Sequence, residues 1–310
     1  MNFSVFLTTI YNSIGLGLIH APVVIGVFMS LRVMKRPDLT VEGSFAFGAV
    51  ITMTMLHHGA HFMTAILVAP IGGAIAGLTT ALIHTKLKVD GIISGLLVTL
   101  SLFSVNLYIM GGSLISAPLD TLVFTPVRLW LVDFGMASHA ARLWAHIIVG
   151  AIALTVVITV LFFLYSTSFG LSIRATGDNE RMACSIGINT DSRKIISLII
   201  SNAFIALSGS LFTQQGGADV NIGTGILIVG LASLVIGEII TPKNANILTR
   251  LLFIALGSFI YFSCINFIIA TGLLSSDWTR LLTAVLAMLA ICIPKLRKIR
   301  FRKSIGVNNK

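Results

Sequence analysis

The polar residues with the clearest potential for chemistry occur in two similar short stretches of this 310-residue chain. One reads Asp38-Leu39-Thr40-Val41-Glu42-Gly43-Ser44, and the other reads Asp219-Val220-Asn221-Ile222-Gly223-Thr224-Gly225. Each places an aspartate, polar or small groups and a glycine just before an expected helix. Helix N-termini carry free N–H groups and a partial positive charge, which suits a carboxylate or a polar solute. The alternative is ordinary N-capping by Asp and Thr at two unrelated helices.

A third polar stretch, FGLSIRATGDNERMACSIGIN at residues 169–189, separates two strongly apolar runs. We predict that residues 172–176 extend the preceding helix and that residues 177–178 form a turn. Asp178 or Asn179 then caps a short helix that begins near residue 180. Gly187 ends this helix, because glycine readily adopts the positive φ of a C-terminal cap.

The surface of this short helix is expected to carry the small residues Ala183 and Ser185. Such a helix is shaped to sit in another protein's groove. A plain connecting loop is the alternative for the same stretch.

Histidine and cysteine residues do not form a convincing metal site. His57 and His61 are four residues apart, the spacing that aligns side chains on one helix face. No cysteine or carboxylate adjoins them, and a short exposed turn is favoured, so no metal site is predicted. The three cysteines, Cys184, Cys264 and Cys292, are scattered and predict no disulfide framework.

The elements that must position all these residues are membrane spans. Hydrophobic residues make up 56% of the chain and charged residues only 10%, whereas soluble domains carry about 25% charge. Apolar runs of this length without strict alternation favour helices over a closed barrel. We therefore predict an all-α, polytopic transmembrane bundle that forms one domain over residues 1–310. About nine spans are expected, with eight to ten open: 13–33, 43–56, 62–83, 92–111, 143–165, 194–215, 222–240, 247–270 and 279–294.

The second span is too short to cross about 30 Å of hydrocarbon as a straight helix. It must be broken or extended by polar turns. In the third span Gly73 and Gly77 are four residues apart, a spacing that permits close contact between helices.

The distribution of basic residues predicts the orientation of the chain. With the N-terminus outside and the C-terminus in the cytoplasm, all of the 21 Lys and Arg residues except Arg128, Arg142 and Arg280 lie on the cytoplasmic side. The second and seventh spans then run in opposite directions, the pattern of an inverted repeat whose helix starts face a central pathway.

The net charge of +10 does not require a nucleic acid. The basic tail at residues 295–310 directly follows a span, so it is expected to lie against anionic lipid headgroups. Ionisable groups are almost absent from the middles of the spans, and the sequence contains no Walker A or H-E-x-x-H motif. The chain is therefore not expected to be an enzyme, and its energy is expected to come from a partner.

The stretch GLSIRATGDNERMACSIGIN resembles the cytoplasmic coupling segment of ABC importer permeases in the branched-chain amino acid and ribose permease superfamily. The likeness continues through RPDLTVEGSF (36–45), IHTKLKVDGIISGLLVTLSLFSVNLYIMG (83–111), ISNAFIALSGSLFTQQGGADVNIGTG (200–225) and VGLASLVIGE (229–238). These stretches cover most of the chain. Within the superfamily the chain looks closest to permeases linked with tryptophan or tyrosine uptake.

The resemblance implies a permease subunit in the bacterial cytoplasmic (inner) membrane that imports a small solute, with an amino acid, and among these an aromatic one, as the implied cargo. A second permease copy, as a homodimer, would complete one pathway. A binding protein outside the membrane would deliver the solute. Cytoplasmic ABC ATPase subunits would hold ATP and Mg, and this chain would bind no cofactor itself.

The resemblance also implies roles for individual residues. Within a coupling segment at residues 166–193, the positions expected to couple to the ATPase are Arg174, Gly177, Asp178, Glu180, Ala183, Gly187 and Asn189. The polar residues expected along the substrate pathway are Asp38, Thr40, Glu42, Ser44, Asn106, Asn202, Asp219, Asn221 and Glu238. A helix opened by DLTVEG that begins inside the membrane would move Asp38 and Thr40 toward the pathway.

Three other functions compete with this interpretation. A secondary carrier that works alone for a small polar solute would suit the inverted repeat, but the lack of buried carboxylates counts against ion coupling. An intramembrane enzyme could use Ser208, Ser210 and His146, although no motif joins a nucleophile to a base. A structural membrane scaffold is the third.

Overall fold

The fold is helical almost throughout in a computed structural model that describes residues 3–242, 244–272, 278, 281–290 and 292. The longer helices are α1 (Phe3–Phe28), α2 (Thr40–His57), α3 (Phe62–Thr85), α4 (Gly91–Met110), α6 (Ser138–Ser166), α9 (Thr190–Thr213), α10 (Ile226–Ile240) and α11 (Ile247–Ala270). The shorter ones are α5 (Phe124–Asp133), α7 (Ser168–Asp178), α8 (Glu180–Ser185) and an unlabelled helix at Leu281–Ala290. A π-helical turn, η1 (Met29–Val33), extends α1, and η2 (Leu119–Thr121) is a 3₁₀ turn.

Six helices in the described part of the chain are long and apolar enough to cross a membrane. They are α1 with its η1 extension, α3, α4, α6, α9 and α11. This confirms the prediction of an all-α, multi-pass membrane protein. Three further predicted spans coincide with α2, α10 and Leu281–Ala290, but α10 has only 15 residues and is about 22 Å long at 1.5 Å per residue. The total number of crossings therefore stays a prediction.

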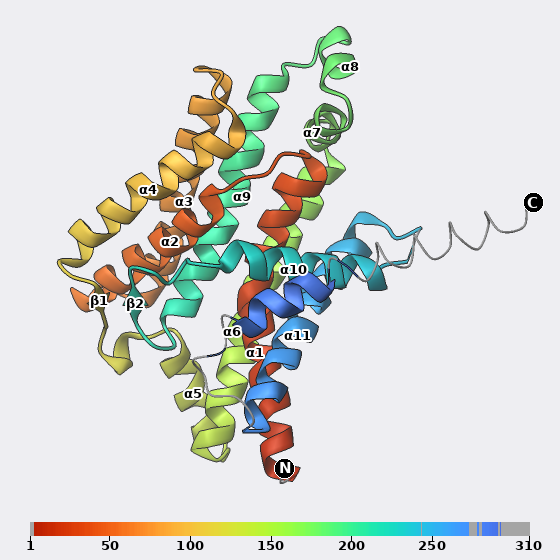
Figure 1. The fold of residues 1–310 in the computed structure, drawn as a ribbon. Helices are drawn as coiled ribbons and strands as arrows, with labels where there is room; N and C mark the ends of the chain where they lie inside the picture. The colour runs from red at the N-terminus through yellow and green to blue at the C-terminus, as the bar shows by residue number, and fades with distance from the viewer. Residues whose placement is uncertain (1–2, 243, 273–277, 279–280, 291, 293–310) are drawn as a thin grey trace, which may run out of the picture.

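The hydrophobic core is centred on α1. The most apolar window of α1 is 78% buried, because α6, α9, α10 and α11 pack around it. The helices α2, α3 and α4 lie together on the opposite side of α9 from α1 and α6, and α10 crosses the direction of α1 (Figure 1). α9 thus joins the two halves of the bundle.

The contact between α3 and α9 depends on small residues, as expected from the sequence. A Cβ atom added to Gly73 would overlap the carbonyl oxygen of Asn202, and one added to Gly77 would overlap that of Leu198. The two backbones can approach this closely only because these positions carry no side chain.

The second predicted span is extended by a polar first turn rather than broken. α2 has 18 residues and begins at Thr40, after an irregular segment from Met34 to Leu39. Asp38 in that segment contacts Asn202, which lies halfway along α9. α2 therefore starts inside the bundle and not at its end.

A two-stranded ribbon lies at one edge of the bundle. β1 (Leu114–Ile115) and β2 (Ala218–Asp219) pair antiparallel, with Leu114 opposite Asp219. The ribbon ties the loop after α4 to the loop before α10.

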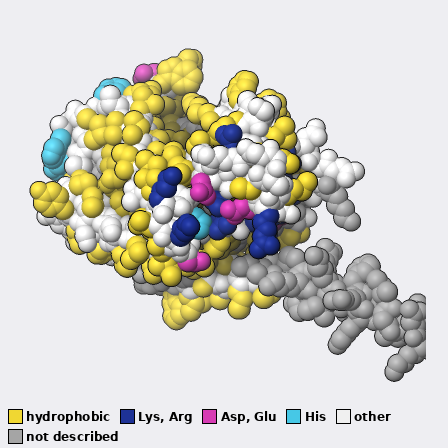
Figure 2. All heavy atoms as spheres, turned by 90° about the horizontal axis from the view of Figure 1, so that it is seen from above, with side chains coloured by type: hydrophobic (Ala, Val, Ile, Leu, Met, Phe, Trp, Pro, Cys, Tyr) yellow, Lys and Arg dark blue, Asp and Glu magenta, His cyan; other side chains and the backbone are white. Residues whose placement is uncertain are grey.

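The helices α7 and α8 lie at one end of the molecule, and the N-terminus and α5 lie at the other (Figure 1). Ion pairs at the α7–α8 end join Lys35 to Asp178 and Arg36 to Glu180. Seen from above, this end carries basic and acidic side chains in a group, surrounded by hydrophobic side chains (Figure 2). The concentration of charged groups at this end agrees with the uneven distribution of basic residues in the sequence. The orientation of the chain in the membrane stays a prediction, and the tail at residues 295–310 and Arg280 lie outside the described residues.

Candidate functional site: a buried helix junction below a charged face

The start of α2 is held by a buried polar network around Asp38. One carboxylate oxygen of Asp38 accepts a hydrogen bond from the Thr40 backbone N–H at 2.8 Å, and the other accepts from Asn202 Nδ2 at 2.8 Å. Ser44 Oγ donates to Asn202 Oδ1 at 2.7 Å. Asp38, Ser44 and Asn202 are all buried, and this mutual pairing offsets the cost of removing their polar groups from water.

The same turn of α2 is fixed to α3. The Thr40 and Thr80 hydroxyls form a hydrogen bond at 2.7 Å, and both residues are buried. The structure brings together four residues that were expected along the substrate pathway: Asp38, Thr40, Ser44 and Asn202. The expectation that buried carboxylates are absent was wrong, because Asp38 is buried beside the middle of α9.

The first turn of α2 also meets the start of α10. Glu42 Oε1 accepts a hydrogen bond from the Gly225 backbone N–H at 3.0 Å, and Gly223 packs directly against the Glu42 carbonyl oxygen. The two similar sequence stretches therefore come together in space. A free helix start suited to a substrate carboxylate was one expectation, but at α10 the carboxylate of Glu42 already takes the Gly225 N–H.

The two aspartates of these stretches each accept the same kind of local hydrogen bond, but they lie in different surroundings. Asp219 Oδ1 accepts from the Asn221 backbone N–H at 2.6 Å, as Asp38 does from Thr40. Asp219 and Asn221 are exposed, however, and belong to β2 and the turn after it, several residues before α10.

Two other expected pathway residues lie apart from the network. Asn106 is buried on α4. Glu238, near the end of α10, forms an ion pair of 2.5 Å with Arg32 of η1. The carboxylate of Glu238 is therefore paired at the charged end of the molecule and is not part of the buried network.

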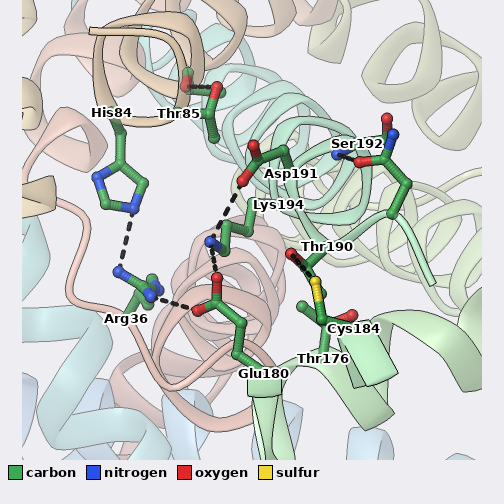
Figure 3. Close-up of polar contacts among 12 residues, drawn as sticks. Arg36, His84, Thr85, Thr176, Glu180, Cys184, Thr190, Asp191, Ser192 and Lys194 are labelled. Carbon is green, nitrogen blue, oxygen red and sulfur yellow. Dashed lines mark hydrogen bonds and ion pairs between the residues drawn. The ribbon is translucent and has the colours of Figure 1, made fainter. Parts of the chain in front are cut away.

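The charged end is organised around Glu180, the first residue of α8. Glu180 forms ion pairs with Arg36 at 2.7 Å and with Lys194 of α9, and Lys194 also lies 3.5 Å from Asp191 (Figure 3). Arg36 Nη1 lies 3.1 Å from Nε2 of His84, at the end of α3. One short helix is thereby tied to α3, α9 and the segment that leads into α2.

A second ion pair joins the same elements. Lys35 Nζ lies 2.8 Å from Asp178 Oδ1 at the end of α7. The hydrogen bond and the charge of Lys35 lower the pKa of Asp178. Partial burial by itself raises the pKa of Glu180, but the hydrogen bonds and charges of Lys194 and Arg36 outweigh it, so the pKa of Glu180 is lower than its ordinary value.

The 169–189 stretch forms two helices. Thr167 Oγ1 accepts from the Gly170 N–H at 3.3 Å and caps α7 as a helix separate from α6, so residues 172–176 do not extend α6 as expected. Asn179 caps α8 by accepting from the Met182 N–H at 3.1 Å. Gly187 has φ +84° just after α8, which confirms the predicted left-handed end.

Two expectations for this stretch were wrong. Gly177 lies inside α7 and not in a turn, and an added Cβ would overlap the carbonyl oxygen of Val33. Ala183 is only 2% exposed, because its face of α8 packs inward toward the bundle. Ala183 therefore does not lie on the outer surface of α8.

The outward surface of α7 and α8 instead carries larger apolar side chains, which sequence reasoning missed. Leu171, Met182 and Ile186 are 58%, 63% and 66% exposed, and we call them the α7–α8 apolar patch. The spacing of four between Met182 and Ile186, which places both on one helix face, was the available signal. Arg174 is exposed on α7, and Asn189 caps α9 by accepting from the Ser192 N–H.

The histidines after α2 have local roles. His57 Nδ1 lies 2.8 Å from the Ser116 carbonyl oxygen, and His61 Nδ1 accepts from the Met63 N–H at 3.2 Å and caps α3. All three cysteines are free thiols on the surface of the chain.

Comparison with known proteins places this geometry in context. Residues 9–291 match the family described as branched-chain amino acid transport system / permease component. A tyrosine transport system permease protein from Clostridioides difficile (strain R20291) is 37% identical over 270 residues, which are 86% of this chain and 85% of that protein.

More distant relatives agree with this match. An autoinducer 2 import system permease protein, LsrC, from Salmonella choleraesuis (strain SC-B67) is 28% identical over 66% of this chain and 56% of its own length. The solved structure of PsaBC from Streptococcus pneumoniae in complex with Fab superposes with a TM-score of 0.51 over 97% of this chain and 96% of that chain, at 13% identity. At that identity the likeness shows the fold alone.

Proposed function

This chain belongs to the family of permease components of branched-chain amino acid transport systems, and from that premise we propose that it is the membrane subunit through which an ABC importer moves an amino acid. The observation that carries the proposal is the connection between an exposed apolar patch on α7–α8 and the buried start of α2. A permease that is driven by a separate ATPase needs such a connection between its cytoplasmic surface and its interior.

The ATPase subunit docks on the α7–α8 apolar patch. Leu171, Met182 and Ile186 expose apolar area beside charged groups, the combination expected of a surface that fits a groove in another protein. Arg174 lies on the same segment and supplies charge at the rim. Gly187 and Asn189 set the path of the chain between α8 and α9 and do not contribute contacts of their own.

Movement of α8 is passed to α2 through Glu180 and Arg36. Arg36 pairs with Glu180 and lies two residues before Asp38, which anchors the start of α2 to Asn202. The parallel pair of Lys35 and Asp178 ties the end of α7 to the same short segment. A displacement of α7 and α8 by the ATPase therefore pulls directly on the residues that hold the α2–α10 junction.

The solute passes beside this junction, and its class follows from the relatives. The C. difficile relative is named as a tyrosine permease, so we propose an amino acid, aromatic in type, as the cargo. A second copy of the chain, in a homodimer, completes the pathway. The assembly lies in the bacterial inner membrane, where a binding protein outside delivers the solute and the ATPase inside holds ATP and Mg.

One experiment tests this proposal most directly. The tagged chain is co-expressed with candidate ATPase and binding-protein subunits and purified in lipid, and ATP hydrolysis is measured with amino acids and sugars presented by the binding protein. Met182→Asp should abolish co-purification of the ATPase. Leu119→Asp, at a still more exposed apolar site on η2 just before α5, should not. Normal co-purification of Met182→Asp would refute docking at this patch.

A secondary carrier stays as the second candidate, because Asp38 and Glu42 place carboxylates inside the bundle. Ion-coupled carriers use such groups. Uptake of the same solutes by proteoliposomes that contain this chain without any ATPase, under a proton or sodium gradient, would favour the carrier.

A further inference from the structure

A small cavity of about 60 Å³ lies where α2, α4 and the loop before α10 meet. Its polar lining consists of Glu42, Thr99, Asn106 and Thr224, and Phe103 is among its apolar neighbours. Phe103 and Thr224 are exposed, so the cavity opens toward the surface of the single chain on that side. Polar groups at such an opening do not suit a lipid-facing surface.

Asn106 supplies the first sign of a ligand. The residue is only 1% exposed, yet its Oδ1 atom has no hydrogen-bond partner. A buried acceptor without a partner pays the full cost of its removal from water. A hydrogen-bond donor bound in the cavity would recover that cost.

Glu42 supplies the second sign. Its Oε1 atom accepts from the Gly225 N–H, but Oε2 forms no hydrogen bond and no cation pairs with Glu42 in the described part of the chain. A cap on α10 requires only one carboxylate oxygen. The second oxygen is a further acceptor at the same cavity.

Asn106 Oδ1 and Glu42 Oε2 therefore give the cavity two hydrogen-bond acceptors without donors. A helix start alone would favour an anion, but the carboxylate of Glu42 occupies the start of α10 and reverses that preference. The face of Phe103 adds a weaker attraction for a cation. The cavity is larger than the ~10–15 Å³ that a single water needs on this measure, so it has room for an –NH₃⁺ group.

From this geometry we propose that the cavity between α2, α4 and the α10 start binds the ammonium group of the solute, with Glu42 and Asn106 as its acceptors. The remainder of the solute extends past Thr224 and Phe103 toward the second copy. This inference rests on the proposed transport function for its biological meaning, but the binding site can be tested without it.

The test measures thermal stabilisation of the purified chain with its ATPase in lipid nanodiscs, without the binding protein. Methylammonium chloride is compared with tetramethylammonium chloride, which carries the same charge but has no N–H donor. Tyramine is compared with 3-(4-hydroxyphenyl)propionate, which keeps the ring but has no ammonium group. Methylammonium and tyramine should raise the unfolding temperature, and their counterparts should not.

Two variants assign the effect to the cavity. Glu42→Gln keeps an acceptor for the Gly225 N–H but removes the charge, and Asn106→Ala removes the other acceptor. Each should raise the half-saturating concentration of methylammonium and tyramine about tenfold or more. Ser101→Ala, on an exposed turn of α4 where the hydroxyl bonds only the Leu97 carbonyl, is the matched control and should leave both concentrations unchanged.

Equal stabilisation by tetramethylammonium or by the propionate would overturn the proposal, as would unchanged binding in Glu42→Gln. Stabilisation by sodium in preference to choline that is lost in Glu42→Gln would also overturn it, in favour of a metal-cation site. A failure of ATP-driven uptake would count against the proposed transport function and leave the ammonium measurement intact, so the two failures can be distinguished.

Discussion

Asn202 donates a hydrogen bond of 2.8 Å to Asp38 across 164 positions of sequence, and in doing so fixes the start of α2 halfway along α9. The bond does more than stabilise the fold. It places the buried junction two residues from Arg36, whose ion pair reaches the charged end of the molecule.

Replacement of Asn202 by Ala should destabilise the protein by roughly 2–3 kcal/mol, because one buried oxygen of Asp38 loses its donor. Unfolding in mixed detergent micelles measures the loss. The double variant Asp38→Ala/Asn202→Ala removes both partners, so it should cost less than the sum of the two single variants. Strict additivity would mean that the two side chains are not coupled.

Replacement of Glu180 by Gln should separate ATP hydrolysis from transport. The amide cannot hold Arg36 and Lys194 by charge, so α8 loses its firm connection to the segment before α2. We expect the ATPase to co-purify normally while the amount of solute moved per ATP falls severalfold in proteoliposomes. Lys86→Gln, which removes a charge near the same end outside this cluster, serves as the control.

The stability of the purified protein should fall in acid. The folded-state pKa values of Asp178 and Glu180 are below their ordinary values of 3.8 and 4.5, so their ion pairs stabilise the fold fully above those values. That stabilisation is lost as the pH falls through the folded-state values. Thermal unfolding between pH 7 and pH 3 measures the effect, and the Glu180→Gln/Asp178→Asn variant should show a weaker decline over this range.

Replacement of Gly187 by Val should weaken ATPase docking. A β-branched residue at φ +84° costs roughly 1–3 kcal/mol, although open space surrounds the position, so the change displaces the end of α8. Gly187→Asn is the matched comparison, because Asn tolerates the left-handed conformation. Co-purification of the ATPase should fall with Val and persist with Asn; equal retention would show that the cap does not shape the docking surface.

Local features of the structure followed well from the sequence. The cap before α8 could be narrowed to Asp178 or Asn179, and Gly187 could be assigned to the end of that helix, because capping depends on a few neighbouring residues. The apolar segments were likewise recognisable, because hydrophobicity over a helical length is a property of the segment alone. The short second segment was the one ambiguous case, since the polar first turn of α2 is buried by distant partners.

Contacts over long sequence distances could not be derived in this way. Glu42 and Gly225 are 183 positions apart, and the similarity of their surroundings indicated a relation without giving a bond. The inward face of Ala183 and the packing of Gly177 against η1 depend on how whole helices dock. Size and polarity alone therefore suggested a surface position for Ala183 that tertiary packing reversed.

The position of the α2 start also has a consequence for how the chain assembles in the membrane. Asp38 is synthesised long before Asn202, so its carboxylate has no native donor on α9 while α2, α3 and α4 first enter the bilayer. The hydrogen bond that anchors the segment before α2 can form only after α9 has been inserted beside α3. The contacts at the start of α2, an early segment of the chain, are thus completed only when the later segment α9 is in place.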